Sequence, residues 1–211
     1  QGQTMTPAEL RKRLHSGETS FGTLIVSPSP RWPAVVKTCG LDFVFIDTEH
    51  IALDRCELSW MCQTYAALGL PPLVRIPSPD SYAATMVLDG GAAGVIAPYV
   101  ESAEQVQALR GGVKLRPIKG RRLQDILQGA SIESELDAYV RTSADDRLLI
   151  VNIESAPAIE ALDEILAVPG LDAVLIGPHD LSCNLGVPER YDHPDFLNAC
   201  ETVFRKCRAA G

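Results

Sequence analysis

Short apolar segments alternate along the chain with segments of helical periodicity, and this alternation constrains the fold more than any other feature. Residues 43–46 and 148–153 are continuous apolar runs, as expected of strands buried on both faces of a sheet. Because helices separate the strands, we expect parallel pairing with right-handed crossovers, in an open doubly wound sheet or a closed barrel. The strands are predicted at 21–26, 43–46, 73–76, 94–97, 148–153 and 173–176.

Predicted helices fill the intervals between the strands. Thr6 and Glu9 have the spacing of a capping box at the start of the first helix. Residues 110–147 are less regular and more polar, and one further helix is expected there, while Gly111-Gly112 is interpreted as a turn. The helices are predicted at 6–16, 32–39, 55–67, 81–88, 103–109, 132–142, 158–167 and 196–210.

Polar side chains follow strand after strand, at Asp47, Arg75, Glu154 and Asp180. An open sheet would gather such residues at one switch point, whereas a barrel presents them around one rim. No glycine-rich phosphate-binding motif follows a strand in the sequence. We therefore expect an α/β fold, a TIM (β/α)8-type barrel in a single domain over residues 1–211. Since a closed barrel has about eight strands, the six predicted strands suggest truncation after about six β/α units.

Charge and composition narrow the class of function. The net charge of −8 and the lack of a basic run in the sequence argue against nucleic-acid binding, which depends on clustered Lys and Arg. The sequence has no apolar stretch of membrane-spanning length and no signal-peptide pattern at its start, so we expect a cytoplasmic location without membrane attachment. The six cysteines are scattered without a CxxC pair, which favours reduced thiols.

Two carboxylates at the ends of neighbouring predicted strands form a candidate metal site. Glu154 follows the strand at 148–153, and Asp180 follows the next strand. Each alone could simply cap the helix that comes after it. Because adjacent parallel strands lie about 4.8 Å apart, the two side chains can share one ion. Oxygen ligands completed by water and substrate suit Mg²⁺ or Mn²⁺, with Co²⁺ as an alternative.

Further polar residues at strand ends are candidates for proton transfer and charge stabilisation. Asp47 stands three residues before His50, and a carboxylate so placed can orient an imidazole that acts as a general base. Glu49 is equally near, so the spacing leaves open which carboxylate orients His50. Arg75 lies in an apolar strand-end run, where burial favours pairing with a substrate anion; a structural ion pair is the alternative. Asp89, judged alone, is interpreted as a turn residue.

Several short motifs occur in order over nearly the whole chain. They are GLDFVFIDTEH (Gly40–His50), VRIP (Val74–Pro77), LDGGAAGVIAP (Leu88–Pro98), KGRR (Lys119–Arg122), NIES (Asn152–Ser155), PGLDAVLIGPHDLS (Pro169–Ser182), Gly186 and YDHP (Tyr191–Pro194). This ordered set resembles the HpcH/HpaI aldolase family, the class II pyruvate-type aldolases related to the citrate lyase β-like enzymes. The chain departs from the family pattern at Asn152, where members often carry Gln, and after KGRR, where a Gly- or Ser-rich stretch is usual.

The resemblance implies a role for each candidate residue. The metal ligands of the family fall on Glu154 and Asp180. The catalytic base falls on His50 with Asp47 as its partner, and the arginine that steadies the 2-oxo oxygen falls on Arg75. The other residues implicated are Asp89, which matches an acidic residue near the active site, and a substrate-binding set of Arg75, Gly177, Pro178, His179 and Asp180.

The resemblance also implies a reaction and an assembly. The reaction is cleavage or formation of a 4-hydroxy-2-oxo acid, which yields pyruvate enolate and an aldehyde with a divalent metal as Lewis acid. The barrel would be of the phosphoenolpyruvate/pyruvate-domain type, in a homo-oligomer that is a hexamer or a trimer. The five lysines lie in helical or polar contexts, which disfavours a Schiff-base mechanism. Two alternatives stay open: a citrate lyase β-like enzyme acting on a CoA thioester, and a non-catalytic scaffold or binding protein of the same fold.

Overall fold

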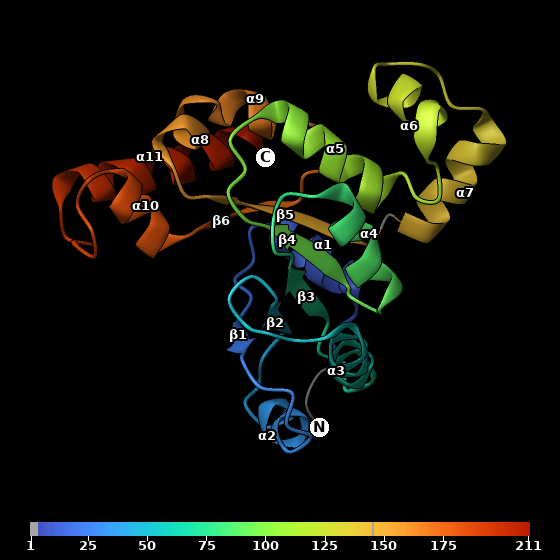
Figure 1. Cartoon of the computed structure of the whole chain (residues 1–211), viewed down its shortest axis with the longest axis horizontal. Helices are drawn as coiled ribbons and strands as arrows, with labels where there is room; N and C mark the ends of the chain where they lie inside the picture. Colours follow the sequence, from blue (N-terminus) through green and yellow to red (C-terminus); the bar gives the residue numbers. More distant parts are fainter. Residues whose placement is uncertain (1–3, 145) are drawn as a thin grey trace.

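Six parallel strands form one sheet in which each strand pairs with the next along the chain. The structure, a computed structural model, describes residues 4–144 and 146–211. Figure 1 shows the sheet curling into part of a barrel with most helices outside, which confirms the expected α/β barrel of about six β/α units. The strands are β1 (Gly22–Ile25), β2 (Phe43–Asp47), β3 (Pro72–Arg75), β4 (Gly94–Ala97), β5 (Leu148–Ile153) and β6 (Ala173–Ile176).

Helices connect the strands, and most begin with a side chain that accepts a backbone hydrogen bond. The predicted capping box of Thr6 and Glu9 is confirmed. Among the described residues, no helix combines the length and apolar character needed to cross a membrane. The helices are α1 (Pro7–His15), α2 (Trp32–Lys37), α3 (Arg55–Ala67), α4 (Ser81–Asp89), α5 (Ala103–Lys114), α6 (Gly120–Leu127), α7 (Ser134–Ala144), α8 (Ala156–Glu160), α9 (Leu162–Leu166), α10 (Pro178–Asn184) and α11 (Pro194–Ala210).

The strands bury apolar side chains on both faces, because successive residues of a strand point to opposite sides of the sheet. The outward side chains, such as Val74 and Val151, pack against the helices in the larger core. The inward side chains, such as Leu73 and Ile150, form a second core that includes Leu10 of α1. This inner core is an apolar floor beneath the carboxyl ends of the strands.

Residues 110–147 contain more regular structure than predicted. The interpretation of Gly111-Gly112 as a turn is wrong, because both glycines lie inside α5. A Cβ at Gly112 would lie 2.6 Å from the backbone oxygen of Ser81, so the glycine lets α5 pack closely on the start of α4. Helix α6 follows α5 and was not predicted, and its buried Ile126 joins a small separate core with Leu115 and Val140.

Neither of the two carboxylates at the strand ends occupies an N-cap position. Ser155, not Glu154, caps α8, because its hydroxyl accepts a hydrogen bond from the backbone N–H of Ala158. Gly177 occupies the N-cap position of α10, a helix that was not predicted, and Asp180 lies within its first turn. The helix predicted at 158–167 is divided into α8 and α9.

Candidate active site

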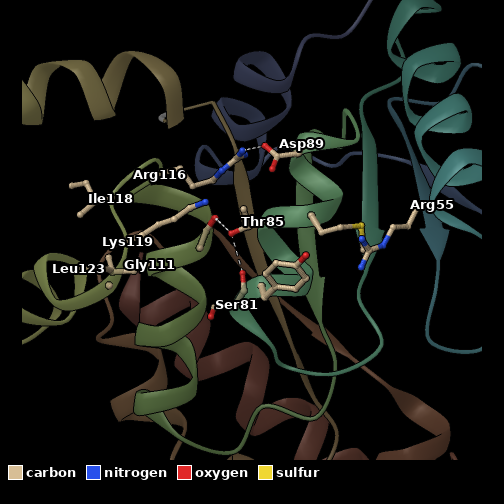
Figure 2. A pocket seen from close by; sticks show the side chains of 13 residues that line it. Arg55, Ser81, Thr85, Asp89, Gly111, Arg116, Ile118, Lys119 and Leu123 are labelled. Carbon is tan, nitrogen blue, oxygen red and sulfur yellow. Dashed lines mark hydrogen bonds and ion pairs between the residues drawn. The ribbon is translucent and has the colours of Figure 1, made fainter.

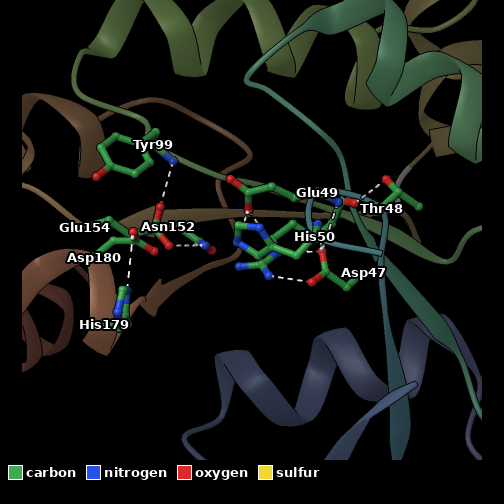
Figure 3. Close-up of polar contacts among 10 residues, drawn as sticks. Asp47, Thr48, Glu49, His50, Tyr99, Asn152, Glu154, His179 and Asp180 are labelled. Atoms are coloured by element: carbon green, nitrogen blue, oxygen red, sulfur yellow. Dashed lines mark hydrogen bonds and ion pairs between the residues drawn. The ribbon is translucent and has the colours of Figure 1, made fainter. Parts of the chain in front are cut away.

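A layer of polar side chains lies above the apolar floor, at the carboxyl ends of the strands. Asp47 and Arg75 are the last residues of β2 and β3 and are partners in the register of the sheet. On β5, Asn152 and Glu154 alternate with outward residues and so share the inward face of Ile150. The strand ends therefore bring together the predicted residues of β2, β3 and β5, and Figure 3 labels those of β2 and β5.

Glu154 is almost fully buried and is held by two hydrogen bonds. Its Oε1 accepts from the side-chain amide of Asn152 at 2.6 Å, and its Oε2 accepts from the backbone N–H of Tyr99 at 3.0 Å. Each carboxylate oxygen has a further lone pair. The bonds thus orient the carboxylate and leave it able to bind a cation.

Asp180 lies beside Glu154 at the start of α10 (Figure 3). Its carboxylate accepts no hydrogen bond from the part of the chain that the structure describes, and Nδ1 of the neighbouring His179 lies 3.8 Å from it. Burial, followed by the negative charges of Asp180 and Glu154, raises the pKa of Tyr99. Both charges therefore act on one phenol, as expected if the two carboxylates face the same space.

Arg75 is fixed by a pair of hydrogen bonds to a buried carboxylate. Its Nε and Nη2 donate to the two oxygens of Asp47 at 2.9 and 2.6 Å, and Nε lies 3.2 Å from Glu49 Oε2. The guanidinium also stacks on the Phe45 ring, with Cζ 5.3 Å from the ring centroid. These two hydrogen bonds use only part of the guanidinium, so further N–H groups of Arg75 can donate to a substrate oxygen.

Burial and the mutual contacts of Asp47, Glu49 and Arg75 shift the pKa of each of these three side chains. Burial works against ionisation of Asp47, but the hydrogen bonds from Arg75 and from the Glu49 backbone outweigh it and lower the pKa of Asp47. Burial also works against the charged form of Arg75, and Asp47 outweighs it, so the pKa of Arg75 is raised. For Glu49 burial dominates over the attraction of Arg75, and the pKa of this carboxyl is raised.

His50 lies on the loop after β2, and its side chain is 60% exposed. The contact between Asp47 and His50 is through the backbone, because Asp47 Oδ1 accepts from the His50 N–H at 3.4 Å. The imidazole Nε2 instead lies 3.6 Å from Glu49 Oε2. The expectation that Asp47 orients the imidazole is therefore wrong in this structure: Arg75 occupies the Asp47 carboxylate, and Glu49 is the carboxylate nearest to the ring.

The chemistry of the cluster fits a divalent cation. The carboxylates of Asp47, Glu49 and Glu154 act on the guanidinium of Arg75, and Asp180 lies beside Glu154, so the site carries an excess of negative charge. The buried Oδ1 of Asn152 has no hydrogen-bond donor in the described residues, as expected beside a site that takes water or substrate. No group of three or more His, Cys, Asp or Glu side chains with metal-binding geometry occurs in residues 4–144 and 146–211, so water and substrate would complete the coordination.

Asp89 does not join this cluster within one chain. It is the last residue of α4, a helix that starts near the carboxyl end of β3 and returns toward the amino end of β4. Its carboxylate pairs with Arg116 in a pocket of about 570 Å³ between α4, α5 and α6 (Figure 2). Lys119 of the KGRR motif lines the same pocket. The expectation that Asp89 lies near the active site is therefore not met inside this chain.

Tyr99 is the site residue that sequence reasoning missed. Its contribution to Glu154 is a backbone N–H, and such a contact leaves no trace in residue type. Asn152 was noted only as a departure from the family pattern. The two-residue spacing of Asn152 and Glu154 on a predicted strand was the available signal, because it places both side chains on one face.

Comparisons with known proteins assign the chain to a family. The model of the HpcH/HpaI aldolase/citrate lyase family matches residues 23–211. The chain therefore belongs to this family, and it is an enzyme of the carbon–carbon lyase class. Among its relatives is the 2-keto-3-deoxy-L-rhamnonate aldolase of Klebsiella pneumoniae subsp. pneumoniae, 33% identical over 201 residues that make up 95% of this chain and 75% of the relative.

Solved structures of the family agree with this assignment. An HpcH/HpaI aldolase from Desulfitobacterium hafniense DCB-2 superposes with a TM-score of 0.81 at 31% identity, over 96% of this chain and 78% of that one. The citrate synthase SbnG superposes with a TM-score of 0.82 at 30% identity, also over 96% and 78%. The fold is thus shared by an HpcH/HpaI aldolase and a citrate synthase.

Proposed function

We propose that the chain is a divalent-metal-dependent aldolase that cleaves or forms a 4-hydroxy-2-oxo acid. The observation that carries this proposal is the pair of Glu154 and Asp180, with Arg75 near Glu154 and an excess of negative charge around them. The two carboxylates would hold Mg²⁺ or Mn²⁺, with Co²⁺ as an alternative. When bound there, the cation supplies a Lewis acid for the 2-oxo group.

The residues around this pair bind and orient the 2-oxo acid. Backbone N–H groups of His179 and Asp180, after the Gly177-Pro178 turn, receive the substrate carboxylate. Arg75 donates a hydrogen bond to the 2-oxo oxygen, where negative charge grows as the carbon–carbon bond breaks. Because Asp47 and Phe45 hold the guanidinium in place, this donor needs no rearrangement during the reaction.

Proton transfer is assigned to His50. As the bond between C3 and C4 breaks, its electron pair stays with the pyruvate fragment, and the proton of the 4-hydroxyl passes to the imidazole directly or through water. The exposed position of His50 fits this task, since the aldehyde must leave toward solvent. The carboxylate of Glu49, whose Oε2 lies 3.6 Å from His50 Nε2, stabilises the imidazole once it has taken up the proton.

The substrate class follows from the relatives. The similar aldolase of Klebsiella is named for 2-keto-3-deoxy-L-rhamnonate, which is a 4-hydroxy-2-oxo acid. We propose a 2-keto-3-deoxy sugar acid as the substrate, together with an assembly of identical subunits and a cytoplasmic location. Sedimentation of the purified chain tests the assembly, which we expect to be a hexamer or a trimer.

Pyruvate release from a panel of 4-hydroxy-2-oxo acids, including 2-keto-3-deoxy-L-rhamnonate, tests the proposed reaction. We expect release with Mg²⁺ or Mn²⁺ and none with EDTA. Glu154→Gln and Asp180→Asn should each abolish the metal-dependent rate. Glu164→Gln, on the exposed side of α9, is the matched control and should leave it unchanged. An unaltered rate in either site variant contradicts the metal assignment.

The solved citrate synthase supports a second candidate function, in which the same site joins carbon atoms with a CoA thioester as co-substrate. The two functions are separated by one measurement. Pyruvate released from a free 4-hydroxy-2-oxo acid without CoA supports the aldolase. Thiol released from acetyl-CoA only in the presence of a 2-oxo acid supports the synthase.

A further inference from the structure

Tyr99 has a strained backbone at the candidate active site. Its φ is 47°, in the left-handed region that is unfavourable for residues with a Cβ atom. Among the described residues, Glu189 is the other non-glycine residue with a positive φ. Strain of this kind persists where the surrounding structure enforces it, and it is concentrated at functional sites.

The strain serves Glu154, because the left-handed turn after β4 aims the Tyr99 N–H at Glu154 Oε2. A glycine or an asparagine would supply the same N–H with less strain. The backbone contact therefore does not explain why a tyrosine stands at this position, and its side chain needs a separate explanation.

The Tyr99 side chain is 41% exposed and extends on the α10 side of Glu154 (Figure 3). Its hydroxyl makes no hydrogen bond within the part of the chain that the structure describes. Besides burial, the nearby acidic groups that raise the pKa of this phenol most are Asp180 and Glu154, followed by Glu101. In Figure 3 the phenol lies on the opposite side of Glu154 from Asp47, Glu49 and His50.

This placement separates two halves of the site. In the proposed function, the reacting 2-oxo oxygen and the aldehyde half lie on the Arg75 and His50 side. The carboxylate of the 2-oxo acid lies on the α10 side, where acidic neighbours make an added negative charge costly unless donors face it. Tyr99 is a neutral donor with a hydroxyl available on that side.

We propose that Tyr99 is a substrate-binding residue whose hydroxyl donates a hydrogen bond to the carboxylate of the bound 2-oxo acid. The inference rests on the proposed function for the identity of the substrate. It assigns Tyr99 two separate tasks: its backbone orients a metal ligand, and its side chain selects an acid with a free carboxylate next to the oxo group.

The experiment compares Tyr99→Phe and Tyr99→Asn with the unaltered chain in oxaloacetate decarboxylation with Mn²⁺, a reaction that needs no aldehyde. Loss of the hydroxyl in Tyr99→Phe should raise KM about threefold to tenfold and leave kcat within about twofold. Tyr99→Asn tolerates the left-handed backbone and should show a similar rise in KM without a lower Tm. The matched control is Tyr82→Phe, an exposed tyrosine in the pocket of Figure 2, which should leave KM unchanged.

Titration calorimetry gives a readout that is independent of turnover. The affinity for Mn²⁺ alone should be equal in Tyr99→Phe and the unaltered chain, while pyruvate binding in the presence of Mn²⁺ weakens. Equal pyruvate affinity overturns the inference, as does a parallel loss of Mn²⁺ affinity in Tyr99→Phe, which would indicate a structural role. If no substrate releases pyruvate, the proposed function fails, and the two titrations still decide whether Tyr99 binds a 2-oxo acid.

Discussion

Gly177 leaves open the space that the carboxylate of Glu154 occupies. A Cβ atom on residue 177 would lie 2.1 Å from Glu154 Oε1 and 2.6 Å from its Cγ, which are impossible contacts. Since Ile153 and Ile176 are register partners, the residues that follow them meet at the same height above the sheet. The glycine of the GPHD segment is thus a requirement of the candidate metal site.

Gly177→Ala should displace the Glu154 side chain from its hydrogen bonds with Asn152 and Tyr99. We expect a loss of Mn²⁺ affinity of about 10- to 100-fold, the range typical when a group that orients a metal ligand is removed. Calorimetric titration with Mn²⁺ measures it. Gly111→Ala is the control, because its methyl group would meet only the ends of the Leu123 and Leu127 side chains, at 3.1 and 3.4 Å. Equal Mn²⁺ affinities in both variants would show that Glu154 is not a ligand.

The ion pair of Asp47 and Arg75 has a structural role and a proposed catalytic role, and a double mutant separates them. Arg75→Met should destabilise the fold by about 3 kcal/mol, because Asp47 is left buried without its partner. Adding Asp47→Asn should recover most of that free energy of unfolding, measured in urea. Activity should stay lost in both variants, by at least about 100-fold in kcat/KM. Activity that returns together with stability would reduce Arg75 to a structural ion pair.

The strands were predictable because each is a short apolar run, and β5 matches its predicted range of 148–153. Elements that depend on tertiary contact were not predictable in the same way. Gly111-Gly112 continues α5 because the helix packs on the Ser81 backbone, and local sequence contains no sign of that contact. Helix α6 was missed because it packs mainly on its own small core.

The candidate site was predictable to the extent that it depends on strand ends. Glu154, Asp180 and Arg75 follow apolar runs, and parallel strands place such residues at one rim. The sequence could not predict which carboxylate lies next to the His50 ring, because Asp47 and Glu49 are both near His50 in sequence. Only the structure shows that the Asp47 carboxylate is hydrogen-bonded to Arg75. The role that the resemblance implied for Asp89 is not met within one chain, because Asp89 lies at the end of α4 away from the candidate site.

His50 and Glu49 should separate two reactions of the same site. His50→Ala should lower aldol cleavage by about 100-fold or more, since the 4-hydroxyl then lacks its base. Oxaloacetate decarboxylation, in which no hydroxyl is deprotonated, should change by less than about fivefold. Glu49→Gln should have a smaller effect on cleavage. The control is His15→Ala, which lies on α1 far from the site and should change neither reaction. Equal losses in both reactions would remove His50 from the role of base.

Asp172 connects α1 to the sheet at the end opposite to the candidate site. Its fully buried carboxylate accepts hydrogen bonds from Arg11 Nε at 2.6 Å and from the backbone N–H of Leu149 at 2.8 Å. The same carboxylate lies 2.6 Å from Lys114 Nζ and 3.0 Å from His15 Nε2. Burial alone would raise the pKa of Asp172, but Lys114 and the hydrogen bonds outweigh it, and the pKa is lowered. The ionised form therefore stabilises the folded state.

Asp172→Asn should lower the free energy of unfolding at pH 7 by about 3 kcal/mol, because the largely buried Lys114 loses its counter-charge. Since the pKa of Asp172 is lower in the folded than in the unfolded chain, its stabilisation is complete above the unfolded value of about 4 and is lost as the pH falls below it. Urea unfolding between pH 3 and 7 should thus show the gap between the variant and the unaltered chain narrowing in acid. Asp163→Asn, which breaks the exposed pair with Lys206, should cost less than about 1 kcal/mol. A gap that stays constant below pH 4 would contradict the assignment.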